Sequence, residues 1–169
     1  MNIETLRSLQ APLKARYRED PSSANQTLEA RGVLDADDVV CRVDSFLGAV
    51  PSGLHPSAGG DGTHACAASI LLEALVGCLG VTLKAVATAL EISIRGGTIA
   101  ARGELDFRGT LGIDKTAPVG FKSIAVSFDL DTDAPQDRVN KLVELTERYC
   151  VVYRTLREPP PITLEQVKH

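Results

Sequence analysis

Apolar residues in the first half of the chain fall into two segments with helical spacing. Residues 3–17 carry apolar side chains every three or four positions, ahead of a turn-prone Asp-Pro-Ser-Ser stretch at 20–23. Residues 64–90 are apolar nearly all round, which is typical of a helix enclosed by protein. The pattern therefore predicts a short N-terminal helix and a long, buried central helix.

Alternating polar and apolar residues predict two short strands between these helices. Residues 27–34 and 38–43 are expected to form an antiparallel pair, joined by a turn at 35–37. The segment 48–62 is rich in proline and glycine and is expected to be a loop. Loops of this length are often functional.

A second group of strands is predicted after the central helix. Gly96-Gly97 is typical of a hairpin turn, here between residues 90–95 and 98–107. Residues 121–130 alternate again and predict a further strand.

A second helix is expected to begin at Asp133, which can cap the first turn together with Gln136 three residues on. It must end before the three prolines at 159–161, and weak alternation over 162–167 predicts a last edge strand. Taken together, the elements predict an α+β protein in which helices pack on an antiparallel sheet.

Size and charge narrow the class of protein. The 169 residues suit a single domain, and 18 basic against 22 acidic residues give a net charge of -4, which disfavours nucleic acid as a partner. The N-terminus has no apolar signal segment, so we expect a cytoplasmic protein. Glu73 interrupts the apolar run of the central helix, which favours burial in a protein core over a membrane span.

Four cysteines, at 41, 66, 78 and 150, are the main candidates for chemistry. They form no Cys-x-x-Cys pair, and in a reducing compartment they are thiols by default. Cys66 and Cys78 lie about 18 Å apart along one helix, too far for a disulfide. Cys41 shares a strand face with valines, which is typical of a core residue. Cys78 and Cys150 remain as the reasonable pair.

Each of these two cysteines has a functional and a structural interpretation. Cys78 lies mid-helix near Gly77 and Gly80, whose missing side chains leave room for a ligand, but a small core residue would give the same pattern. Cys150 follows the apolar stripe of the second helix, with Arg154 one turn on, and a nearby arginine favours a thiolate. A helix end that continues the core would have the same sequence.

Other polar residues give weaker signals. His55, His64 and Cys66 lie in or beside the glycine-rich loop, but their spacing matches no common metal site. The chain has no phosphate loop or dinucleotide fingerprint. The residues thus give no strong signal for a metal or for an organic cofactor. Glu73 needs a partner if it is buried.

Two cysteine segments resemble those of the OsmC/Ohr family, the osmotically induced protein C and organic hydroperoxide resistance proteins. GGDGTHACAASILLEALVGCLGVTLKAVA, at 59–87, is similar to the family's Leu-Leu-x-Ala-Leu-x-x-Cys helix, and CVVYRTL, at 150–156, is close to its Cys-Pro-Val-x-Arg-Thr-Leu. The resemblance implies the OsmC-like fold, an antiparallel sheet wrapped around a long buried central helix in an intertwined homodimer. Residues 1–24 would form an N-terminal helical arm on a domain spanning 25–169.

The resemblance also implies a reaction. Cys78 would be the peroxidatic thiolate, which attacks an organic hydroperoxide and becomes a sulfenic acid. Cys150 would then resolve the sulfenic acid as a disulfide. A dithiol reductant, a lipoyl protein or a thioredoxin-like protein, would reopen that disulfide.

The sequence departs from the family's peroxidase branch beside the first cysteine. That branch has a glutamate ten residues before its helix cysteine, and this glutamate holds an arginine that stabilises the thiolate. Here the position is Ala68. Glu73 lies about 140° around the helix from Cys78, so it cannot simply take over this role.

The stabilising arginine and the second cysteine segment differ as well. The turn at 35–37 holds no arginine, so Arg31 or Arg42 would serve only through a different geometry, and Arg154 is a further candidate. Val151 replaces the proline that follows the second cysteine in the family.

Three functional hypotheses follow. The leading one is a cysteine-based peroxidase for organic hydroperoxides, with hydrogen peroxide as a second candidate substrate, in oxidative stress defence. The rival, favoured by Ala68, is a non-catalytic protein on the same fold that binds a small molecule or senses redox state. The third is a structural dimer module in which both cysteines are inert.

Overall fold

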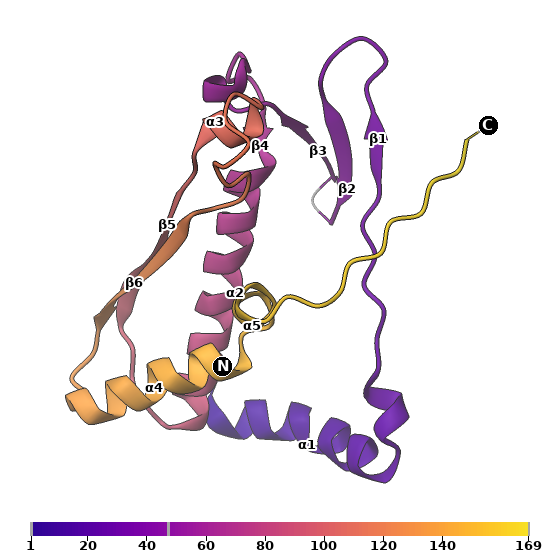
Figure 1. The fold of residues 1–169 in the computed structure, drawn as a ribbon. Coiled ribbons are helices and arrows are strands. Elements are labelled where there is room, and N and C mark those ends of the chain that lie inside the picture. Colours follow the sequence, from indigo (N-terminus) through magenta and orange to yellow (C-terminus); the bar gives the residue numbers. More distant parts are fainter. Residues whose placement is uncertain (1, 47, 169) are drawn as a thin grey trace.

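The chain folds into α-helices and two small β-sheets (Figure 1). The computed structural model describes residues 2–46 and 48–168. The main elements are α1 (Ile3–Glu19), β1 (Gly32–Leu34), β2 (Cys41–Ser45), β3 (Gly48–Gly53), β4 (Ala65–Cys66), α2 (Ala67–Ala89), β5 (Gly96–Glu104), α3 (Phe107–Thr110), β6 (Ser123–Asp131), α4 (Gln136–Tyr149) and α5 (Val151–Arg157).

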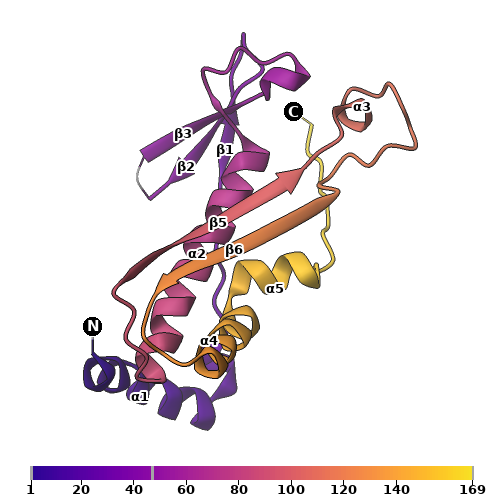
Figure 2. The ribbon, with the colours of Figure 1, turned by 90° about the vertical axis from the view of Figure 1, so that its left-hand side faces the viewer.

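The strands form two separate sheets. The first has the order β1-β2-β3-β4, with antiparallel pairs except for the short parallel pair β3 and β4. The second is a two-stranded antiparallel ribbon of β5 and β6, which crosses in front of α2 in Figure 2. The predicted α+β class and the antiparallel pairing of β1 with β2 are therefore confirmed.

The core forms where one face of α2 meets the β5–β6 ribbon, α4 and α5. Four α2 residues spaced by four along the chain are buried: Leu75, Leu79, Leu83 and Ala87. Leu142 of α4 is fully buried against the C-terminal half of α2. The opposite face of α2 is open in the single chain, where Val81 is 74% exposed. By length and composition alone α2 could cross a membrane, a test that core helices of soluble proteins also pass.

The segment predicted to be a loop, 48–62, begins as a strand instead. Gly48–Gly53 forms β3, whose residues 48–52 pair with β2, and Pro51 lies opposite Arg42. The turn-forming residues of this segment obscured the strand, because the pairing depends on a neighbouring strand rather than on local propensity. Leu47, which follows Phe46 in the chain, lies outside the described residues.

The hairpin predicted around Gly96-Gly97 is wrong. Both glycines belong to β5, which pairs with the distant β6, and residues 90–95 form no strand. At Gly97, φ is 144°, and an added Cβ would lie 2.2 Å from the carbonyl oxygen of Asp129. A glycine is therefore needed here because two strands approach closely. In the sequence, such a glycine is easily mistaken for a turn residue.

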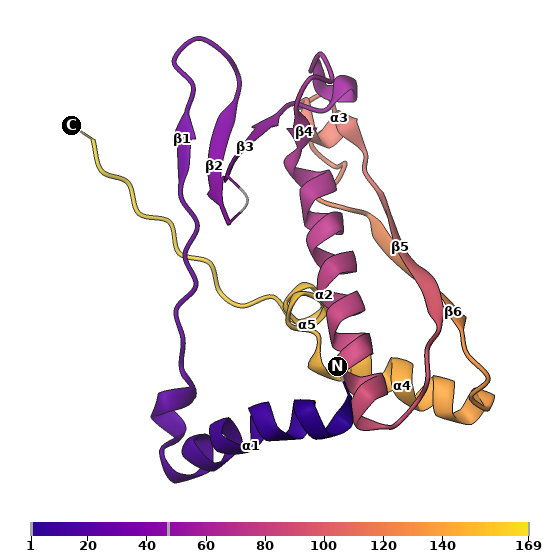
Figure 3. The same ribbon diagram turned by 180° about the vertical axis from the view of Figure 1, so that it is seen from behind.

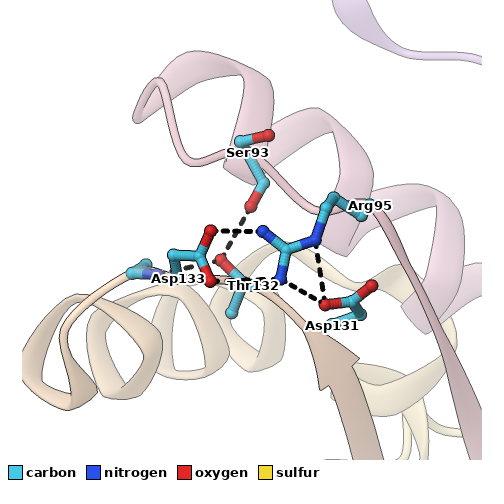
Figure 4. Close-up of polar contacts among 6 residues, drawn as sticks. Ser93, Arg95, Asp131, Thr132 and Asp133 are labelled. Atoms are coloured by element: carbon cyan, nitrogen blue, oxygen red, sulfur yellow. Dashed lines mark hydrogen bonds and ion pairs between the residues drawn. The ribbon is translucent and has the colours of Figure 1, made fainter.

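Asp133 does not cap the second helix as predicted. Helix α4 begins at Gln136 with Pro135 at the N-cap, and Asp133 instead accepts hydrogen bonds from Arg95 (Figure 4). Arg95 also donates to Asp131, 2.5 Å from Nη2 to Oδ1, so one guanidinium joins the start of β5 to the segment that leads into α4.

The end of the chain also differs from the prediction. The second helix is broken at Cys150, and α5 carries it on to Arg157, before the prolines. Residues 158–168 contain no strand, and Ile162 and Leu164 are 83% and 95% exposed. In Figure 3, this tail extends away from the body of the molecule, and the segment that leads from α1 to β1 does the same. An edge strand needs a neighbouring strand, and the single chain supplies none here.

Candidate functional site

Cys78 lies halfway along α2, on the flank of its buried face. Its side chain is half-buried and packs against a cluster built on Leu75, Leu79 and Cys150. The exposed side of the helix is open at Gly77, where an added Cβ would meet no atom within 4 Å. The sulfur is therefore anchored in the core on one side and lies close to solvent on the other.

Cys150 occupies the break between α4 and α5. Its backbone is extended, with φ -75° and ψ 114°, so it ends one helix and precedes the next. Its N–H donates to the carbonyl of Thr146, and its own carbonyl accepts from the N–H of Arg154. The break turns the fully buried thiol of Cys150 toward α2, next to Cys78.

The surroundings of Cys78 favour its thiolate. Burial raises the pKa of the Cys78 thiol, but hydrogen bonding from the Val152 amide, the Cys150 thiol and the Val151 amide outweighs burial. The Thr82 side chain, one helical turn on, lowers the pKa further. The pKa of Cys78 therefore lies below its ordinary value.

The pKa of the Cys150 thiol is shifted in the opposite direction, above its ordinary value. Burial raises the pKa of its thiol most strongly, hydrogen bonding from the Tyr153 amide opposes this, and the neighbouring sulfur of Cys78 raises the pKa again, so that the net shift is upward. When the pKa values of two neighbouring groups move apart, their chemical roles separate. Of the two thiols, Cys78 therefore loses its proton more readily, and Cys150 keeps its proton more readily.

The structure does not bring the other candidate residues to this pair. Arg42 binds Asp35 on the β1–β2 hairpin at 2.9 Å, and Arg154 binds Glu158 at 2.7 Å. Arg31 and Glu73 are exposed. None of the four is among the groups that act most strongly on the pKa of Cys78.

Three contributors to the site were missed in the sequence. Thr82 lies four residues after Cys78, and helical spacing could have indicated it, because residues i and i+4 are neighbours on a helix. The amides of Val151 and Val152 could not have been found, since they face Cys78 only because the chain breaks at Cys150.

A cavity of about 300 Å³ borders the cysteine cluster. Leu75, Ile124, Val126 and Tyr153 line the cavity and also belong to the cluster around Cys150. The other lining residues are Phe121, Lys122, Ser123, Leu156 and Arg157. The lining is largely apolar, with two cationic side chains.

Comparison with solved structures shows the same fold in several proteins. An OsmC-like protein from Mycoplasma pneumoniae matches with a TM-score of 0.66 at 15% identity, covering 80% of this chain and 90% of that one. An organic hydroperoxide resistance protein from Legionella pneumophila matches at 0.58 and 16%, covering 79% and 90%. One from Bacillus subtilis matches at 0.55 and 18%, covering 78% and 93%. Identities this low show the fold alone.

The sequence itself matches a family model. The model describes OsmC-like proteins and covers residues 60–165, more than half of the chain, including both Cys78 and Cys150. The search of curated proteins found no match. On the strength of the family model and the shared fold, this chain belongs to the OsmC-like protein family.

Proposed function

We propose that this protein is a thiol-dependent peroxidase that reduces organic hydroperoxides through Cys78 and Cys150. The observation that carries the proposal is the contact between the two cysteines, with the pKa of Cys78 lowered and that of Cys150 raised. Two solved structures of the same fold are organic hydroperoxide resistance proteins, which supports this substrate class.

The chemistry proceeds in two steps. The Cys78 thiolate attacks the terminal oxygen of the hydroperoxide, the O–O bond breaks, and the organic group leaves as an alcohol after taking a proton. Cys78 is then a sulfenic acid. The sulfur of Cys150 attacks it, the proton of Cys150 leaves with the hydroxyl as water, and a disulfide remains. A dithiol reductant supplies the two electrons that restore both thiols.

This site would stabilise its thiolate without an arginine. The Val151 and Val152 amides, together with Thr82 and the Cys150 thiol, provide hydrogen bonding to the sulfur. Hydrogen bonding to the charged form of a group lowers its pKa, as a nearby cation does. The absence of a glutamate at Ala68 is therefore compatible with a reactive Cys78.

We also propose that the working form is a homodimer in the cytoplasm. The open face of α2 and the exposed tail leave apolar residues uncovered in the single chain, with Val81 74% and Leu164 95% exposed. The edge of β1 and one edge each of β5 and β6 are free to pair within the described residues. A second copy would cover this surface. Thiol chemistry of this kind suits a reducing compartment.

The proposal is tested by titrating the reduced protein with cumene hydroperoxide and, separately, with hydrogen peroxide. Free thiols and intact mass are followed in the wild type, Cys78→Ser and Cys150→Ser. We expect rapid loss of two thiols and two mass units in the wild type, and no rapid reaction in Cys78→Ser. Cys150→Ser should gain oxygen without forming the disulfide.

A matched control variant, Cys41→Ser, should behave as the wild type, because Cys41 lies on β2 in the other sheet. Oxidation of the wild type no faster than that of an exposed free thiol would contradict the peroxidase.

The cavity beside the cysteine cluster favours a second candidate, a protein that binds a small apolar molecule. Its apolar walls and the cations Lys122 and Arg157 suit a ligand with an apolar body and an acidic group. Slow oxidation combined with saturable binding of such a ligand would support this function in place of catalysis.

A further inference from the structure

The two sulfurs of the cysteine pair differ sharply in access to solvent. Cys150 is fully buried, with 0% of its surface exposed, whereas Cys78 is only partly buried. The side chains that enclose Cys150 include Leu75 and Leu79 of α2, which are themselves 2% and 1% exposed. They belong to the same chain, so binding of a partner can only increase the burial of Cys150.

This difference matters when the disulfide is reduced, because thiol–disulfide exchange can begin at either sulfur. The attacking thiolate approaches along the extension of the S–S bond, from the side opposite the leaving sulfur. To attack Cys150 it would have to come through the core packed around Leu75, Leu79 and Val126. To attack Cys78 it needs only to reach a sulfur that the chain itself leaves partly exposed.

We propose that the reducing thiolate attacks the sulfur of Cys78, and that Cys150 is the leaving group in every turnover. The inference rests on the proposed two-cysteine cycle. A new S–S bond forms between the reductant and Cys78 while the Cys78–Cys150 bond breaks, and Cys150 departs with the electron pair as a thiolate. A second reductant thiolate then attacks the mixed disulfide at the reductant's own sulfur, and Cys78 leaves as the thiolate.

The acidity of the leaving group instead favours attack at Cys150, with Cys78 as the leaving group. The pKa of Cys78 is lowered and that of Cys150 is raised, so Cys78 would be the better leaving group. Exchange rates depend only fractionally on thiol pKa, with a Brønsted coefficient of about 0.4–0.5 for the attacking thiol. Access to Cys150 instead requires local opening of the core, which native proteins rarely populate. The difference in solvent access therefore outweighs the difference in pKa, and the reductant attacks Cys78.

One consequence is that Cys150 never meets the solvent during the cycle. It acts as an internal thiol that resolves the sulfenic acid and later leaves. Cys78 alone would contact both the oxidant and the reductant.

The first test measures access directly in full-length variants that keep one of the two cysteines. In a Cys41→Ser, Cys66→Ser background, Cys150→Ser leaves Cys78 alone and Cys78→Ser leaves Cys150 alone. We expect Ellman's reagent, 5,5′-dithiobis(2-nitrobenzoate), to react with Cys78 at least about a hundredfold faster than with Cys150. In denaturant both should react alike, which shows that the Cys150 thiol is intact. Similar rates under native conditions would overturn the proposal.

The second test identifies the sulfur that is attacked. The disulfide is formed with diamide rather than peroxide, in the Cys41→Ser, Cys66→Ser background, so that the outcome does not depend on peroxidase activity. Excess 2-mercaptoethanol is added, the mixture is quenched with acid within milliseconds, and peptide masses locate the adduct. An adduct on Cys78 with Cys150 free supports the proposal, and an adduct on Cys150 overturns it. Failure of diamide to link the two cysteines would overturn the two-cysteine cycle as well.

Discussion

Thr82 shows how a single side chain can tune the reactive thiol. It lies one turn after Cys78 on α2, half-buried, and its interaction lowers the pKa of the Cys78 thiol. Thr88 on the same helix donates instead to the carbonyl of Lys84, 2.8 Å away, the usual bond of a helical threonine. The two threonines therefore provide a matched pair for experiment.

We expect Thr82→Val to raise the pKa of Cys78, because it removes a hydroxyl that favours the thiolate. In the wild type, the lowered pKa keeps Cys78 ionised at lower pH. In the variant, the pH profile of the rate of alkylation by iodoacetamide should therefore shift to higher pH. At pH 7 the rate should fall by roughly threefold, the equivalent of one weak hydrogen bond.

Thr82→Ser should retain the wild-type pH profile, since it keeps the hydroxyl, and Thr88→Val should leave the profile unchanged. An unshifted profile in Thr82→Val, with the fold intact by circular dichroism, would show that Thr82 has no part in tuning Cys78.

At the scale of elements, the junction of α4 and α5 determines whether a site exists. An unbroken helix would continue past Cys150 in the direction of α4 and would leave Val151 and Val152 with their amides bonded inside the helix. The extended backbone of Cys150 instead starts a new helix whose first amides face Cys78. The position of this junction depends on how α4 is seated on α2, and Leu142 is its buried anchor.

Leu142→Ala should lower the free energy of unfolding by about 2–5 kcal/mol, because the residue is 0% exposed and its loss leaves a cavity. Urea unfolding at a fixed chain concentration measures the change. Leu111→Ala, at a position 51% exposed, is the control and should change stability by no more than about 0.5 kcal/mol. Equal effects of both variants would show that α4 is not anchored through Leu142.

The Arg95 junction illustrates an element contact of a different kind. Arg95 joins β5 to Asp131 and Asp133 ahead of α4, and these groups are solvent-exposed. Exposed ion pairs contribute little to stability and weaken with salt. The ion pairs of Arg95 instead position the backbone, because they fix where the chain leaves β6 and enters α4 (Figure 4).

At the scale of the whole molecule, the single chain leaves its most apolar helix half covered. Only one face of α2 is buried, while Val81 on the other side is 74% exposed. Large exposed apolar surfaces on proteins mark interaction sites. The proposed homodimer accounts for this face.

Val81→Asp should shift the protein from dimer to monomer, because a carboxylate on the covered face would lose its hydration on association. Light scattering coupled to size exclusion, over a range of chain concentrations, measures the change as at least a tenfold weaker association. Val81→Leu keeps the side chain apolar and should remain dimeric. If Val81→Asp dimerises as tightly as the wild type, this face of α2 is not the interface.

Much of the fold and of the candidate site could be predicted from local patterns. The helical spacing over Ile3–Glu19, the apolar run of α2 and the alternation of β6 are properties of short segments, so the sequence displays them directly. The cysteine motifs at Cys78 and Cys150 likewise indicated the family. A motif specifies residue types at fixed spacing, which needs no knowledge of distant contacts.

Only the tertiary structure decided what depends on residues far apart in the chain. Gly97 resembles a turn residue until Asp129 is seen against it, and Asp133 resembles a helix cap until Arg95 is seen beside it. The sequence by itself determined the helices α1 and α2, the strand β6, the α+β class and the motifs that contain Cys78 and Cys150. The tertiary structure decided which strands pair, that the helix breaks at Cys150, and that amides and Thr82 surround Cys78 where an arginine was expected. The physical reason is that these contacts join segments whose approach no local propensity encodes.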